Sequence, residues 1–150
     1  MIISFCGDAE FCKTKEMEET LFSFLEKTIQ NERVCFYLRG SCSFDAFAYD
    51  VCRKYKSTHP SVRLCYVIPY ITEPYLRRIL PLTREKYDMV VYPEIEGQPL
   101  HLALLCRNRW MAKVSDFSIV YAVHRDGAYK AYLHAKQKGK GAFNLADHKR

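Results

Sequence analysis

The chain has 150 residues, of which 49% are hydrophobic and 14% aromatic, and its formal net charge is +6. This composition predicts a packed domain and excludes a disordered chain, because disordered segments are poor in apolar and aromatic residues. We place one domain over residues 1–145 and a frayed tail over residues 146–150. No apolar run approaches the roughly 20 residues that span a bilayer, and the N-terminus lacks the charged region of a secretory signal. We therefore expect a cytoplasmic protein without membrane contact.

Seven cysteines are present, and no two of them form a C-x-x-C pair. Five lie inside apolar strand or helix patterns: Cys6, Cys35, Cys52, Cys65 and Cys106. Because a cysteine thiol packs well as a small hydrophobic group, we expect reduced cysteines, no native disulfide and no metal site.

Five apolar runs predict strands, which begin near Ile2, Val34, Arg63, Met89 and Ser118. Residues 142–145 are a candidate for a small additional edge strand. Between the strands, apolar residues recur at helical spacing from Thr14, from Phe44, and over residues 73–80, 100–114 and 128–138. Pro81 is expected to end the third of these helices and Gly139 the last.

Strand and helix thus alternate five times, and the strands are apolar throughout rather than alternating apolar with polar residues. Both features are typical of parallel strands that are buried on both faces. We therefore predict an α/β protein: a three-layer sandwich with a mainly parallel sheet of about five strands and helices on both faces.

Residues 34–55 are the most informative stretch for function, because a buried strand leads through a glycine turn into a helix. Such a turn directs backbone N–H groups and the positive end of a helix dipole at one point, which suits a phosphate. Gly40 lets a ligand approach the backbone, and Arg39 adds a charged donor. The alternative is purely structural: Ser43 caps the helix, Asp45 favours its first turn, and Gly40 only turns the chain.

Ligands of open parallel sheets bind beyond the carboxyl ends of the strands. The residues that follow the predicted strands are Gly7 and Asp8, then Arg39, Gly40 and Ser41, then Pro69 and Tyr70, then Glu94, and finally His124, Arg125, Asp126 and Gly127. Arg107 and Asn108 lie in a predicted helix, and they are either a solvated face or contacts to a phosphate or ribose. The motifs of P-loop NTPases, NAD dehydrogenases and serine hydrolases are absent from the sequence.

The order of these segments resembles the YpsA-like branch of the SLOG superfamily, a Rossmann-like group that includes DprA and the LOG nucleotide hydrolases. The resemblance covers roughly residues 1–135 and rests on the segments IISFCG, FYLRGSCSFDAFAYDVC, VRLCYVIPY, YDMVVY, CRNRWMAKVSD and IVYAVHRDGAYKAY. Its most specific elements are G-x-x-x-F-D, from Gly40 to Asp45, and R-N-x-x-M, from Arg107 to Met111. The resemblance implies that a nucleotide or nucleotide-derived ligand binds at the carboxyl edge of the sheet.

The sequence departs from this family in two respects. Relatives usually carry a second glycine and a threonine after the last main strand, whereas this chain has Asp126-Gly127-Ala128. LOG enzymes also share a glycine-rich motif that ends in a catalytic glutamate, and no glutamate occurs after Ser115. The missing glutamate speaks against LOG-type cleavage of a nucleoside monophosphate, and the missing glycine and threonine indicate an altered phosphate site.

We therefore expect a cytoplasmic Rossmann-like module that binds a nucleotide-derived small molecule as a sensor or regulator, alone or as a homo-oligomer. One alternative is an N-glycosidic hydrolase whose acid is Asp8, Glu94 or Asp126, and the other is a DprA-like binder of single-stranded nucleic acid. No catalytic residue, metal or fixed cofactor is assigned. The candidate ligand-binding residues are Gly7, Arg39, Gly40, Ser41, Phe44, Asp45, Pro69, Tyr70, Arg107, Asn108, Asp126 and Gly127.

Overall fold

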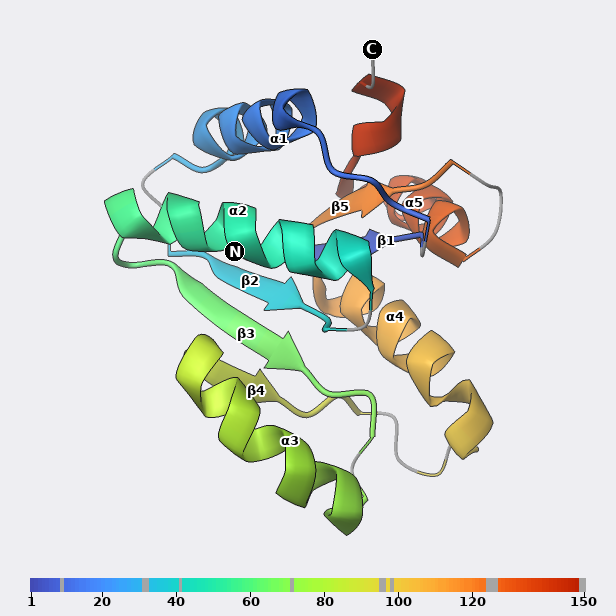
Figure 1. Ribbon diagram of the computed structural model, residues 1–150. Coiled ribbons are helices and arrows are strands. Elements are labelled where there is room, and N and C mark those ends of the chain that lie inside the picture. Colours follow the sequence, from blue (N-terminus) through green and yellow to red (C-terminus); the bar gives the residue numbers. More distant parts are fainter. Residues whose placement is uncertain are drawn as a thin grey trace.

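The computed structural model describes residues 1–8, 10–30, 33–40, 42–70, 72–94, 97, 99–123 and 127–148. Within these residues, six parallel strands form one sheet in the order β4-β3-β2-β1-β5-β6 (Figure 1). The strands are β1 (Ile2–Gly7), β2 (Cys35–Leu38), β3 (Arg63–Val67), β4 (Met89–Val91), β5 (Phe117–Tyr121) and β6 (Gly141–Asn144). The predicted parallel α/β architecture is therefore confirmed, and the additional edge strand pairs in parallel with β5.

The helices cover both faces of the sheet (Figure 1). They are α1 (Lys15–Thr28), α2 (Ser43–Thr58), α3 (Glu73–Lys86), α4 (Ala103–Val114) and α5 (Gly127–Gln137), with short 3-10 turns η1 (Leu100–Leu102) and η2 (Leu145–His148). α2 packs on β1, β2 and β3 beside α1, whereas α4 packs on β1 and α5 on β5 and β6. α3 lies alongside the edge strand β4.

Successive residues of β2 show how the two faces are separated. Phe36 packs edge-on against Phe5 of β1 and Tyr55 of α2, with ring centroids 5.7 and 5.9 Å away. The next residue, Tyr37, stacks on Trp110 of α4 instead, at 6.1 Å. Because side chains alternate across a strand, α2 and α4 must lie on opposite faces of the sheet.

Two polar contacts fix β1 against β5. The Asp116 carboxylate accepts a hydrogen bond from Ile2 N at 2.7 Å at the start of β1, and the Asp8 carboxylate accepts one from Val123 N at 2.9 Å beyond its end. Both side chains satisfy backbone N–H groups outside the ladder, so the strands keep their register to their tips.

The third helix is longer than the prediction, because Pro81 lies inside it rather than after its end. Proline removes one helical hydrogen bond and strains the preceding turn. Here the turn after Pro81 packs against the domain: Thr83 is buried, and the ring of Tyr87 lies 5.2 Å from that of Tyr66. The Tyr87 N–H then donates to Thr83 O at 2.8 Å, so helical hydrogen bonding resumes beyond the proline.

The predicted helix over residues 100–114 begins as η1 and becomes α-helical at Ala103. Leu100 and Leu104, two of the apolar residues at helical spacing, are 63% and 44% exposed. The buried row is Ala103, Arg107 and Met111, which are four residues apart and so share one face. Apolar residues occur on several sides of this helix, so their spacing alone did not reveal which side meets the sheet.

No helix in the described part of the chain is both long and apolar enough to cross a membrane. The seven cysteines, all within the described residues, form no disulfide.

Candidate functional site

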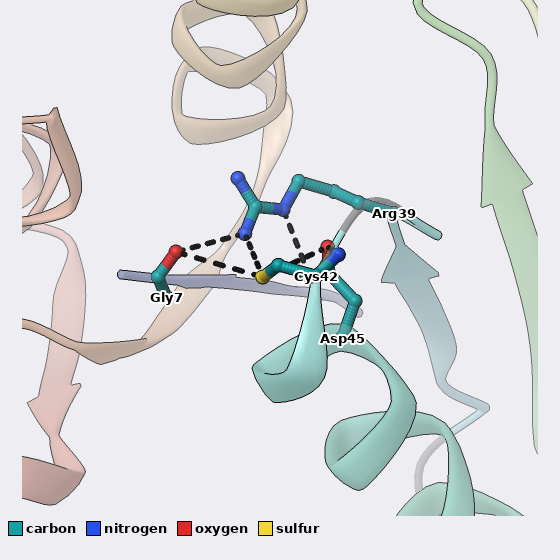
Figure 2. A network of polar contacts seen from close by, with 4 residues as sticks. All are labelled: Gly7, Arg39, Cys42 and Asp45. Atoms are coloured by element: carbon teal, nitrogen blue, oxygen red, sulfur yellow. Dashed lines mark hydrogen bonds and ion pairs between the residues drawn. The ribbon is translucent and has the colours of Figure 1, made fainter. Parts of the chain in front are cut away.

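Arg39, directly after β2, joins the carboxyl ends of two strands to the start of α2 (Figure 2). Its side chain is 6% exposed. Nη2 donates to the main-chain oxygen of Gly7, the last residue of β1, at 3.0 Å, and Nε donates to Asp45 Oδ1 at 2.9 Å. The other terminal nitrogen, Nη1, points away from Gly7, Cys42 and Asp45. Arg39 therefore connects the ends of β1 and β2 to the start of α2, and its Nη1 atom takes no part in these contacts.

Asp45 occupies the first turn of α2 and is 3% exposed. Its Oδ2 accepts a hydrogen bond from the backbone N–H of Cys42, the N-cap residue, at 3.1 Å. The carboxylate thus satisfies a backbone donor at the helix start, as the structural alternative expected of Asp45, but the N-cap is Cys42 and not Ser43, whose hydroxyl donates to Phe11 O at 3.0 Å. An anion bound at this turn would share the N-terminus of α2 with Asp45.

Arg107 of α4 is the largest fully buried side chain, at 1% exposed. Burial, and then the positive charge of Arg39, lower the pKa of the Arg107 guanidinium, while Asp45, Tyr66 and Cys6 act in the opposite direction. Among the described residues the buried charged side chains are Arg39, Asp45 and Arg107, so two guanidinium groups face one carboxylate. Within the described residues, this edge therefore carries more buried positive than buried negative charge.

Two thiols lie in the same environment. Cys42 Sγ is 3.6 Å from Arg39 Nη2 and 3.4 Å from Asp45 Oδ2. Burial is the largest influence that raises the pKa of Cys42, followed by the charge of Asp45, and burial likewise raises the pKa of Cys6. A nucleophilic cysteine needs a lowered pKa, so both thiols stay protonated at neutral pH and serve as packing and hydrogen-bonding groups.

Tyrosines border the turn on the side of α3. The phenol oxygens of Tyr66, on β3, and Tyr75, on α3, lie 2.8 Å apart. A Cβ atom at Gly40 would come within 2.9 Å of the Tyr66 ring, so the glycine leaves room for that ring. Sequence reasoning overlooked Tyr66, because a tyrosine inside an apolar strand pattern cannot be distinguished from core, and it overlooked Cys42, because helix caps are usually Ser, Thr, Asp or Asn.

The other candidate residues have diverse environments. Phe44 is completely buried in the core against Gly7, where a Cβ atom would lie 2.3 Å from its ring. Pro69 is buried, and the Tyr70 ring packs against that of Tyr75 at 5.2 Å. Asn108 Oδ1 is buried and has no hydrogen-bond partner within the described residues. Gly127 is the first residue of α5, whereas Ser41 and Asp126 lie outside the described residues, as do His124 and Arg125.

The structure thus brings Gly7, Arg39, Gly40, Asp45 and Arg107 to one edge of the sheet and leaves Phe44 in the core. In the described part of the chain, no group of three His, Cys, Asp or Glu side chains is placed to hold a metal ion. The fold and this cluster define a Rossmann-like α/β domain with two buried arginines at its carboxyl edge. No protein-family model matches the chain, and no curated protein shows significant similarity to it.

Proposed function

We propose that this chain is a Rossmann-like module of the YpsA-like SLOG type, which binds a nucleotide or nucleotide-derived small molecule as a sensor or regulator. The observation that carries the proposal is the pair of buried guanidinium groups, Arg39 and Arg107, beside Asp45, the one buried carboxylate in the described part of the chain. The pair lies where ligands of open parallel sheets bind.

The energetics of burial support an anionic ligand. Removing a charged group from water carries a penalty of several kcal/mol per ion, which only nearby opposite charge and good hydrogen bonds can offset. Asp45 provides one such charge, and it is hydrogen-bonded to Arg39. A phosphate beside Arg107 and Nη1 of Arg39 would add a further negative charge, through charge-assisted and partly bidentate hydrogen bonds.

No specific observation favours either alternative. Of the acids considered for an N-glycosidic hydrolase, Asp8 already accepts the hydrogen bond of Val123 N, and Glu94 is exposed. A single-strand binder needs a positively charged groove with aromatic side chains on which bases stack. The two arginines of the candidate site, Arg39 and Arg107, are instead buried at the carboxyl edge of the sheet.

Calorimetry with AMP, ADP-ribose, NAD, inorganic phosphate and a short oligonucleotide tests the proposal. We expect at least one of the nucleotides to bind, and Arg107→Met to weaken that binding about tenfold or more, because it removes a charged hydrogen-bond donor. Arg109→Met, two residues further along the same helix at an exposed position, is the matched control and should bind like wild type.

Three outcomes would contradict the proposal. The chain could bind none of the nucleotides, the two arginine variants could bind equally well, or the oligonucleotide alone could bind, with strong dependence on salt. Release of a free base from AMP would instead identify the hydrolase alternative.

A further inference from the structure

A pocket of about 270 Å³ lies between the turn at Gly40 and α3. Tyr66 and Tyr87 contribute aromatic rings to it, with centroids 5.2 Å apart and planes inclined by 46°. Ile79 and Leu82 of α3 add apolar surface, and Leu82 is 61% exposed at the entrance. Thr83, Glu85 and Lys86 of the same helix complete the lining, so the pocket combines aromatic and aliphatic surface with polar groups of α3.

The size of the pocket limits what it can hold. Sites for drug-sized ligands usually enclose about 300–1,000 Å³. A volume just below that range suits a single fused ring system and is too small for a whole dinucleotide. Tyrosine rings favour flat partners, because aromatic faces stack on one another with centroids roughly 4.5–7 Å apart.

Two residues connect this pocket to the charged cluster. Gly40 directly follows Arg39, and it borders the pocket with its backbone. Tyr66 belongs to the pocket through its ring, while its hydroxyl meets Tyr75, and the Arg107 guanidinium is close enough to influence the pKa of Tyr75. One ligand that passes over Gly40 could therefore reach both the tyrosine rings and the arginines.

We infer that this pocket, which Gly40, Tyr66 and Tyr87 border together with α3, binds the heteroaromatic ring of the ligand whose anionic group meets Arg39 and Arg107. The inference rests on the proposed function, because the ring is identified as the base of the nucleotide. It adds a specificity element that the charged cluster lacks: the arginines select for negative charge, and the pocket selects for a flat base.

The experiment uses two probes, adenosine and AMP, which differ only in the phosphate. Leu82→Ala shortens a side chain at the pocket, and Leu133→Ala is the matched control, a partly exposed leucine on α5. We expect Leu82→Ala to weaken binding of both probes by the same factor, about threefold to tenfold, while Leu133→Ala leaves both unchanged. A second measurement is NMR: adenine protons should show nuclear Overhauser contacts to the Tyr66 and Tyr87 rings.

The outcomes separate this inference from the proposed function. If AMP binds without contacts to either tyrosine and with equal affinity for both leucine variants, the pocket inference is wrong and the nucleotide site stands. If adenosine binds in the pocket and AMP binds no more tightly, the pocket stands and the arginine site is wrong. If neither probe binds, the pocket inference is overturned, and the proposed function is then decided by ADP-ribose and NAD.

Discussion

Arg39 Nε and Asp45 Oδ1 are 2.9 Å apart, and this buried ion pair connects the end of β2 to the first turn of α2. The two side chains are 6% and 1% exposed, so solvent screens their interaction little. The same arginine bonds Gly7 O, which ends β1. One ion pair thus holds together three segments of the candidate site.

We expect Arg39→Ala and Asp45→Ala each to lower the free energy of unfolding by about 3–5 kcal/mol, because each leaves a buried charge without its partner. The double variant should lose clearly less than the sum of the two, since it leaves neither charge behind. Urea denaturation of the four proteins measures this coupling. Additive losses would show that the two side chains do not depend on each other.

Gly7 is expected to resist substitution for a packing reason. A Cβ atom there would lie 2.3 Å from the Phe44 ring, which is completely buried and cannot move into solvent. Gly7→Ala should lower the free energy of unfolding by about 1–3 kcal/mol, as overpacking does. Gly40→Ala meets the Tyr66 ring at 2.9 Å and should be milder. Equal thermal denaturation midpoints for wild type and Gly7→Ala would contradict this account.

Cys42 is an unusual residue at the start of a helix, where Ser, Thr, Asp and Asn are preferred. The hydroxyl oxygen of a serine at this position would accept hydrogen bonds better than the sulfur of Cys42 does. We expect Cys42→Ser to raise the free energy of unfolding by about 0.5–1 kcal/mol relative to Cys42→Ala, by the usual strength of a cap. Chemical denaturation decides, and a more stable alanine variant would refute the capping role.

We expect Arg107 to stabilise the complex with an anion but to destabilise the folded protein when no anion is bound. Its pKa is lowered on folding, so the protonated guanidinium is destabilising relative to the unfolded chain at every pH below the folded pKa, including pH 7. Arg107→Met removes this charge and keeps an apolar stem. Without ligand, we expect a free energy of unfolding equal to or above that of wild type. A large loss of stability in urea would show instead that the charge is fully compensated in the folded protein.

Asp88 provides a prediction for acid pH. It accepts hydrogen bonds from Leu64 N at 2.8 Å and from Lys56 Nζ at 2.6 Å. Burial by itself raises the pKa of Asp88, but these two bonds and the charge of Lys56 outweigh it and lower the pKa below its ordinary value of 3.8. A carboxyl whose pKa is lowered on folding stabilises the protein above its unfolded pKa, and this stability is lost as pH falls through the folded value.

Asp88→Asn should therefore be less stable than wild type at pH 7, by about 1 kcal/mol for the weakened hydrogen bonds. The difference should shrink as the pH falls from 5 towards 3, because wild type then loses the same charge. Urea denaturation at several pH values measures it. A difference that stays constant down to pH 3 would contradict the assignment.

Much of the fold could be predicted because local patterns report burial directly. Apolar runs at Ile2, Arg63 and Met89 mark strands that begin at or next to these residues in the structure. The helix expected from Thr14 begins at the next residue, Lys15, and the Thr14 hydroxyl accepts a hydrogen bond from Met17 N. The helix end predicted at Pro81 is wrong, because the packing of the next helical turn compensates for the hydrogen bond that proline removes.

The candidate site depended more on tertiary structure. The glycine turn after β2, with Arg39 beside it, was visible in the sequence because all its residues are neighbours in the chain. Arg107 is different: its burial beside the charge of Arg39 follows from the crossover between β4 and β5, which carries α4 back over β1. No periodicity reports such a crossover, since it joins elements that are far apart along the chain.

The sequence by itself determined that this chain forms a parallel α/β domain with glycine and arginine at the end of its second strand, because burial and turn chemistry act on neighbouring residues. Only the tertiary structure decided the strand order, the buried side of α4 and the environment of Gly40. These depend on which helices and strands, far apart in the sequence, bury apolar surface against each other. That packing alone places the charge of Arg107 and the ring of Tyr66 near Arg39 and Gly40.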